Sequence, residues 1–201
     1  MHLFVYLHGF KSSPNSNKAQ LTKAAIEQRI QAGEPVTWYC PQLPASPREA
    51  MQMVKDHIHA QTFSALSFMG SSLGGYYATY LAELFDSKVS LLNPAIEPAR
   101  DLKKYIGEQK SWHQEEVFHF LPEYIEELQE IYVKKITHAE RYFLLAAKGD
   151  EVLDWRDMVA KYPHAHQLIL EGGDHAISDY PNYLNQLMEF HFRSFTHLKP
   201  T

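Results

Sequence analysis

Short apolar runs alternate along this chain with longer stretches in which apolar residues recur at helical spacing. The first run, Leu3–Leu7, stops at His8-Gly9, as expected of a strand that is buried on both faces and ends in a glycine turn. Residues 18–31 then show helical spacing, with Gly33 just past their end as a helix stop signal. The expected strands are residues 3–7, 36–40, 65–69, 89–92, 142–147 and 167–170, and the expected helices are residues 18–31, 47–60, 73–84, 155–161 and 183–195.

This alternation of strands and helices predicts a parallel sheet with helices on both faces, a three-layer α/β architecture. Residues 97–140 interrupt the rhythm with two or three expected helices and no clear strand. The clearest of these helices is expected at residues 122–135, where an apolar stripe follows a glutamate-rich first turn. The insertion is either a cap over a site or a helical layer that completes one face.

Length and composition describe one ordinary domain of a globular protein. The chain has 201 residues, of which 45% are hydrophobic and 21% charged. A net charge of −5 without a long basic run gives no footprint for nucleic acid. Cys40 is the single cysteine, so no internal disulfide can form, and the N-terminus lacks the features of a signal peptide or membrane span. We therefore expect a cytoplasmic protein.

The segment Gly70-Ser71-Ser72-Leu73-Gly74 follows an expected strand and opens an expected helix, and it fits the pattern G-x-S-x-G. Only Ser72 has glycine two residues away on both sides, because Met69 and Leu73 flank Ser71 at that distance. A serine on such a sharp turn needs glycines around it for steric reasons. Ser72 is therefore the candidate nucleophile, and the N–H of Leu73 a candidate oxyanion donor.

This segment has two other interpretations. Gly70 and Gly75 also have the spacing of a phosphate-binding loop, but Tyr76 and Tyr77 occupy the positions where that loop needs a lysine and a hydroxyl ligand for magnesium. The glycines could also serve only to let a helix pack close to a strand. The presence of suitable partners for Ser72 favours the catalytic interpretation.

A serine nucleophile needs a histidine base and a carboxylate that orients it. In the chain order Ser, Asp, His, Asp150 follows the expected strand 142–147, and His175 follows the strand that ends at Leu170. Parallel strands deliver such residues to one edge of a sheet. Glu151 or Asp154 could replace Asp150 as the acid, whereas Asp174, the neighbour of His175, is expected to face solvent or bond the backbone locally.

Six motifs, three of which contain Ser72, Asp150 and His175, run in order over nearly the whole chain: Tyr6–Pro14, Pro41–Pro44, Gly70–Thr79, Asn93–Ala95, Gly149–Asp154 and Glu171–Ala176. Through them the chain resembles the YqiA-like esterases, small bacterial members of the α/β-hydrolases. The resemblance implies an α/β-hydrolase fold with a small helical insertion. It also implies esterase activity on simple acyl esters and on fatty acyl-CoA thioesters, without a metal or organic cofactor.

Carried over by position, the resemblance makes Ser72 the nucleophile, His175 the base and Asp150 its orienting acid. Phe10 occupies the place of the second oxyanion-hole N–H beside Leu73. Aromatic residues of the insertion are candidates for an acyl groove, or for plain core: Trp112, Phe118 and Phe120. Acyl transfer, peptide cleavage and a silent binding protein remain alternatives to ester hydrolysis on the same fold.

Overall fold

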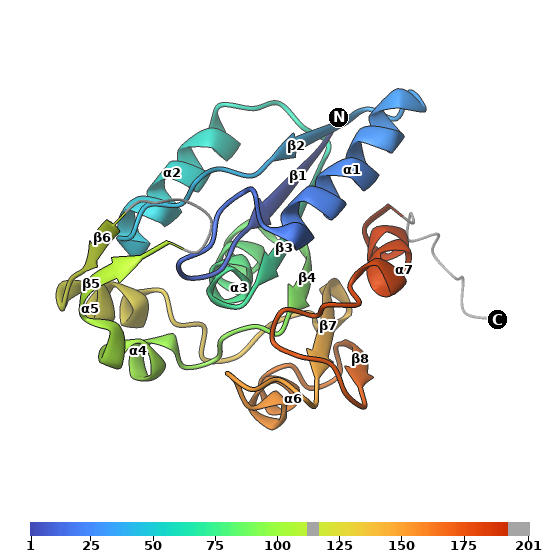
Figure 1. Ribbon diagram of the computed structural model, residues 1–201. Helices are drawn as coiled ribbons and strands as arrows, with labels where there is room; N and C mark the ends of the chain where they lie inside the picture. Colours follow the sequence, from blue (N-terminus) through green and yellow to red (C-terminus); the bar gives the residue numbers. More distant parts are fainter. Residues whose placement is uncertain (112–116, 193–201) are drawn as a thin grey trace.

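A computed structural model describes residues 1–111 and 117–192 (Figure 1). Its main sheet has six strands in the order β2-β1-β3-β4-β7-β8, and every neighbouring pair is parallel. This confirms the predicted α/β fold. The strands are β1 (His2–Leu7), β2 (Val36–Tyr39), β3 (Ala65–Ser71), β4 (Lys88–Leu92), β7 (Tyr142–Ala147) and β8 (His166–Leu170).

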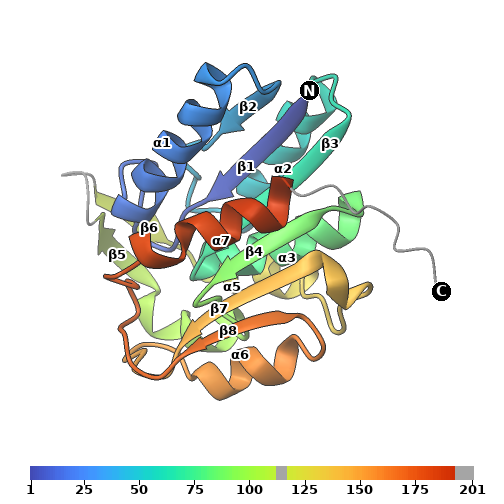
Figure 2. The same cartoon turned by 90° about the vertical axis from the view of Figure 1, so that its right-hand side faces the viewer.

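Helices cover both faces of this sheet (Figures 1 and 2). The first strand shows why both faces must be covered: Leu3 and Val5 belong to one buried cluster, and Phe4 and Tyr6 belong to the other. One face is covered by α1 (Asn17–Gln31) and α7 (Pro181–Phe192), and the other by α2 (Pro47–His59), α3 (Leu73–Phe85) and α6 (Trp155–Lys161).

Most element boundaries agree with the pattern of the sequence. The predicted helix at 183–195 begins earlier, at Pro181, a favoured residue for a first helical turn, and residues 193–195 lie outside the described part of the chain. Within the described residues, no helix combines the length and the apolar character needed to cross a membrane.

The prediction that residues 97–140 hold no strand is wrong. An antiparallel hairpin of β5 (Gly107–Lys110) and β6 (Val117–Phe120) follows the short helix α4 (Pro98–Asp101) and a 3₁₀ turn at Lys103–Tyr105. The strand β5 carries only Gly, Glu, Gln and Lys, so it lacks the apolar alternation by which strands are found in a sequence.

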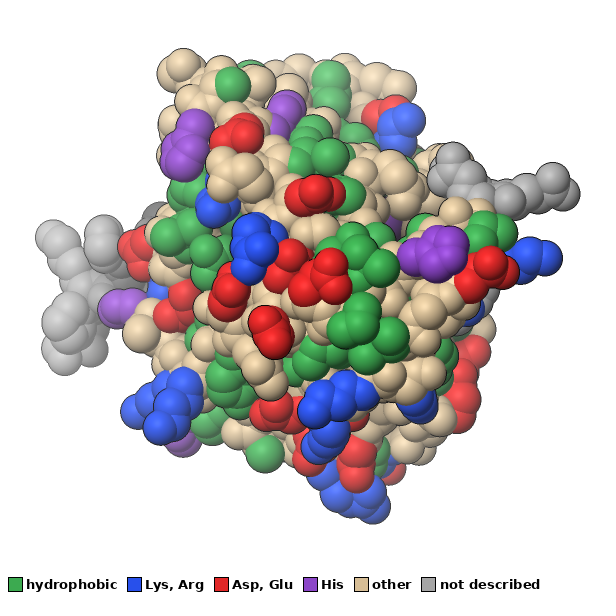
Figure 3. Space-filling model, turned by 90° about the vertical axis from the view of Figure 1, so that its left-hand side faces the viewer, with side chains coloured by type: hydrophobic (Ala, Val, Ile, Leu, Met, Phe, Trp, Pro, Cys, Tyr) green, Lys and Arg blue, Asp and Glu red, His purple; other side chains and the backbone are tan. Residues whose placement is uncertain are grey.

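The helix predicted at 122–135 is also shorter than expected. It is α5 (Glu123–Glu130), which buries Ile125 and Leu128. Beyond the end of α5, the ammonium of Lys161 donates hydrogen bonds to the carbonyl oxygens of Val133 and Lys134. A side chain from α6, and not a continuing helix, therefore provides hydrogen-bond donors for these two carbonyl groups. Figure 3 shows the side of the molecule that carries α2, the hairpin and α5, where apolar side chains are interspersed with charged ones.

Candidate active site

Ser72 lies at the turn between β3 and α3, in a backbone conformation that only a tight turn imposes. Its φ is 56° and its ψ is −121°, far from the usual regions for a non-glycine residue. A Cβ at Gly70 would lie 2.1 Å from the carbonyl oxygen of Gly74, and a Cβ at Gly74 would lie 2.0 Å from that of Leu7. Both glycines are therefore required by backbone that passes too close for any side chain.

His175 links Ser72 to Asp150 in a chain of hydrogen bonds. Its Nε2 lies 3.1 Å from Oγ of Ser72, and its Nδ1 lies 2.7 Å from Oδ2 of Asp150. The side chain of Asp150 is fully buried, and that of His175 is 15% exposed. Because a carboxylate only accepts, Nδ1 donates to Asp150, which leaves Nε2 free to accept the serine proton. The structure thus brings together the three residues that the sequence singled out.

The two other candidate acids have different partners. Oδ1 of Asp150 accepts the N–H groups of Val152 and Leu153, each at 2.8 Å, so that Oδ2 is held toward His175. Glu151 accepts the backbone N–H of His175 at 2.9 Å, and Asp154 caps α6 through the N–H of Arg156 at 2.8 Å. In this geometry, only Asp150 contacts the imidazole.

Asp174 bonds locally, as its position beside His175 predicts. Its carboxylate accepts the N–H and the hydroxyl of Ser178, at 2.8 and 2.5 Å. These hydrogen bonds lower the pKa of Asp174 below its ordinary value. The carboxylate therefore stiffens the loop after His175 and makes no contact with the ring.

Asn93 is a residue of the site to which the sequence alone assigned no role. It follows β4 with a φ of 42° and is completely buried. Its Nδ2 donates to the carbonyl oxygens of Asp174 and His175 at 3.0 and 3.2 Å, and its Oδ1 accepts the N–H of Ala147 at 2.8 Å. One side chain therefore joins the end of β7 to the histidine loop. The signal available in the sequence was an asparagine directly after the apolar run at residues 89–92.

Lys18 is a second residue that the sequence did not point to. From the first turn of α1 its Nζ donates to the carbonyl oxygen of Ala176 at 2.5 Å. Burial lowers the pKa of Lys18 to about 8, although the carboxylates of Asp174 and Asp150 act in the opposite direction. Because Lys18 and Ala176 lie far apart in the sequence, the local sequence pattern does not predict this hydrogen bond.

Phe10 and Leu73, the expected oxyanion donors, flank Ser72. Leu73 is the first residue of α3, where a backbone N–H has no acceptor within its own helix. Gly9 lies so close that a Cβ there would be 3.2 Å from Cβ of Ser72, so the Gly9-Phe10 segment passes directly beside the nucleophile. His8 fixes this segment, since its Nε2 accepts the N–H of Leu43 at 3.0 Å and its Nδ1 donates to Gly9 at the same distance.

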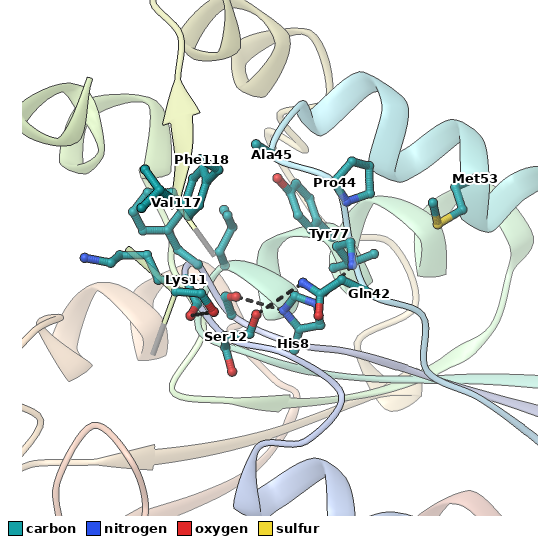
Figure 4. Close-up of a pocket in the computed structure, with 15 residues that line it drawn as sticks. His8, Lys11, Ser12, Gln42, Pro44, Ala45, Met53, Tyr77, Val117 and Phe118 are labelled. Carbon is teal, nitrogen blue, oxygen red and sulfur yellow. Dashed lines mark hydrogen bonds between the residues drawn. The ribbon is translucent and has the colours of Figure 1, made fainter. Parts of the chain in front are cut away.

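Two cavities open on either side of this segment. The first, of about 540 Å³, contains Ser72 and His175, and we call it the polar cavity because most of the residues that line it have polar side chains, among them Ser16, Lys18 and Glu151. The second, of about 510 Å³, is shown in Figure 4 and reaches from Leu73 toward the hairpin. We call it the apolar cavity because its largest group of lining residues is apolar: Phe10, Leu43, Pro44, Ala45, Met53, Leu73, Val117 and Phe118. Polar residues also line it: His8, Lys11, Ser12, Gln42, Tyr77 and Ser111.

The expected aromatic lining is present in part. Phe118 lines the second cavity, and its ring packs edge-on against Phe10 with 5.8 Å between the ring centroids. Phe120 is 1% exposed and belongs to the core instead. Trp112 lies outside the described residues.

A family model matches residues 3–192 of this chain, and it describes an uncharacterised protein family, UPF0227. The chain belongs to this family. UPF0227 is the YqiA-like family that the motifs predicted, so that resemblance is confirmed.

Solved structures of α/β-hydrolases share the fold at low sequence identity. A protein from Agrobacterium vitis S4, provisionally named a hydrolase, is 18% identical with a TM-score of 0.69, covering 94% of this chain and 88% of its own. Est1E from Butyrivibrio proteoclasticus, bound to ferulic acid, is 14% identical with a TM-score of 0.66 and coverages of 95% and 89%. A monoacylglycerol lipase from Paleococcus ferrophilus is 15% identical with a TM-score of 0.62, covering 94% of each chain.

Proposed function

We infer that this UPF0227 protein is a serine esterase that hydrolyses carboxylic esters, and acyl-CoA thioesters by the same chemistry. The observation that carries this proposal is the hydrogen-bonded chain from Ser72 through His175 to the buried Asp150. Esterases and a lipase among proteins of the same fold support it. The site residues supply nucleophile, base and oxyanion donors without a metal or organic cofactor.

In the proposed mechanism, Oγ of Ser72 attacks the carbonyl carbon of the substrate while Nε2 of His175 takes the hydroxyl proton. Asp150 holds the imidazole in the required tautomer and stabilises the imidazolium that forms. The N–H groups of Phe10 and Leu73 receive the oxyanion.

Collapse of the tetrahedral intermediate breaks the bond to the leaving group, which takes its proton from His175. Water then attacks the acyl-Ser72 ester, with His175 again as the base, and releases the carboxylic acid. A thioester follows the same course with a thiol as the leaving group.

The proposal is tested with short p-nitrophenyl esters and with an acyl-CoA, using the wild-type protein beside Ser72→Ala. We expect turnover of the esters by the wild type and loss of activity by about 10³-fold or more in the variant. Ser71→Ala is the matched control, because Ser71 neighbours Ser72 but lies within β3. Equal rates for wild type and Ser72→Ala would refute the mechanism.

A further inference from the structure

The orientation of a bound ester follows from the proposed function, on which this inference rests. The leaving-group atom must lie near Nε2 of His175 to receive its proton, and the carbonyl oxygen must face the N–H groups of Phe10 and Leu73. His175 lines the polar cavity, Phe10 lines both cavities, and Leu73 lines the apolar one. The leaving group therefore occupies the polar cavity, and the acyl group enters the apolar cavity of about 510 Å³.

Tyr77 contributes a polar hydroxyl to the wall of this apolar cavity. It projects from α3, is 3% exposed, and lines the cavity together with Pro44, Ala45 and Phe118. Figure 4 shows its hydroxyl beside Ala45, with Phe118 on the other side of the cavity. Burial raises the pKa of Tyr77 above its ordinary value, so the hydroxyl is a neutral donor at physiological pH.

Among the described residues, the hydroxyl of Tyr77 has no hydrogen-bond partner, and its oxygen is not sealed within the protein but borders the cavity. Other buried tyrosines differ. The hydroxyl of Tyr76 donates to the carbonyl oxygen of Leu128 at 2.5 Å, that of Tyr162 pairs with Thr79 at 2.8 Å, and that of Tyr180 pairs with Thr22 at 2.7 Å. Tyr6 also lacks a partner, but its oxygen is sealed within the core.

A buried hydroxyl is costly when it is left unpaired, and a site built around one discriminates against ligands that cannot satisfy it. A plain hydrocarbon chain in this cavity would leave Tyr77 without a partner and without water. An uncharged acceptor oxygen on the chain would satisfy it. Among the described residues that line the cavity, Lys11 carries a full charge, and Figure 4 shows its ammonium pointing away from Tyr77. A charged group beside Tyr77 would therefore lack a counter-charge, which favours an uncharged acceptor.

We propose that Tyr77 is a specificity residue that donates a hydrogen bond to an oxygen of the acyl group, so that the preferred substrates are esters of oxygen-bearing acyl chains, such as keto or ether acids. Phe118 and Ala45 contact the carbon skeleton of the same acyl group. The polar cavity beside His175 receives the alcohol.

The test compares matched pairs of p-nitrophenyl esters with acyl chains of five to eight carbons. One member of each pair is a plain alkanoate and the other carries a ketone at the penultimate carbon. The ratio of kcat/KM within a pair is measured for the wild type, for Tyr77→Phe and for Tyr76→Phe. Tyr76→Phe is the matched control, because it removes a neighbouring buried hydroxyl whose partner is the backbone of Leu128.

For at least one chain length, we expect the wild type to prefer the keto ester by about tenfold or more. Tyr77→Phe should lose this preference through a fall in kcat/KM for the keto ester, and Tyr76→Phe should keep the wild-type ratio. Ratios that agree within about twofold between wild type and Tyr77→Phe for every pair would overturn the inference while ester hydrolysis stands. A wild type inactive on all these esters would instead refute the proposed function, and this inference with it.

Discussion

Nδ1 of His175 lies 2.7 Å from Oδ2 of Asp150, a carboxylate whose side chain has no exposed surface. The other oxygen of Asp150 is held by two backbone N–H groups at 2.8 Å, so the carboxylate cannot rotate away from the ring. A fixed acceptor at Nδ1 selects the histidine tautomer whose Nε2 faces Ser72. This relationship leaves Nε2 free to accept a proton from Ser72, as the proposed mechanism requires.

Asp150→Asn tests the tautomer directly. An amide in place of the carboxylate can present its NH₂ group to Nδ1, which favours the tautomer that cannot accept the proton of Ser72. We expect kcat for a p-nitrophenyl ester to fall by about 10³-fold or more with little change in KM. Asp154→Asn, at the cap of α6, is the control and should keep near wild-type kcat; equal losses in both variants would contradict the assignment.

Asn93→Gly tests the role of Asn93 as a positioning residue. Glycine tolerates the φ of 42°, so the variant removes the side chain without adding backbone strain. We expect kcat to fall about tenfold while KM stays within about twofold, because the loop that carries His175 loses two hydrogen bonds.

The same variant should lose about 1–3 kcal/mol of stability, since the buried N–H of Ala147 loses its acceptor. Urea unfolding measures this change. A loss of stability with kcat unaltered would show that Asn93 only holds the fold together.

Ala45→Phe tests which cavity takes the acyl group. A phenyl ring at this position would fill part of the cavity of about 510 Å³. With p-nitrophenol as a constant leaving group, we expect kcat/KM for the hexanoate to fall about tenfold or more and that for the acetate to stay within about twofold. A parallel loss on both esters would argue against this cavity as the acyl site.

The lowered pKa of His2 predicts that the folded protein loses stability in acid. Burial, followed by the charges of Lys88 and the N-terminus, lowers the pKa of His2 to about 4, and its Nε2 bonds Oγ of Ser67 at 2.9 Å. The unfolded chain therefore binds a proton first as the pH falls, so the stability that His2 contributes is present above about pH 6.5 and is lost toward pH 4.

Urea unfolding between pH 7.5 and 4 checks this prediction. His2→Gln can keep a hydrogen bond to Ser67 without titrating, so its stability should fall less over this range than that of the wild type, by about 1 kcal/mol after allowance for solvent screening. His191 responds in the same direction, since burial lowers its pKa well below the ordinary value. The exposed His119→Gln is the control, and a pH dependence equal to that of His2→Gln would contradict the prediction.

Much of the fold and the core of the candidate site could be predicted from local patterns. Ser72 was marked by its glycines, and Asp150 and His175 by their positions after two late strands, because parallel strands end at one edge of a sheet. These features depend on neighbouring residues and on chain order. They can therefore be recognised in the sequence alone.

Other features arise only when distant segments meet. The apolar cavity combines residues 8–12, residues 42–45 and the β6 strand, and Lys18 reaches Ala176 across the fold. Neither the lining of this cavity nor the hydrogen bond between Lys18 and Ala176 produces a periodic pattern in the sequence. The hairpin lacks a sequence signal for a different reason: in the described part of the chain β5 pairs with β6 alone, and it needs no apolar face of its own to do so.

The central claim is that Ser72 forms a covalent acyl intermediate, and the most direct measurement is labelling with an alkyl fluorophosphonate followed by peptide mass mapping. This reagent phosphonylates a serine only when a neighbouring base activates it. The account predicts stoichiometric label on Ser72, with parallel loss of ester hydrolysis, and no label in Ser72→Ala. Label on Ser71 or on another residue, or full esterase activity in the labelled protein, would contradict it.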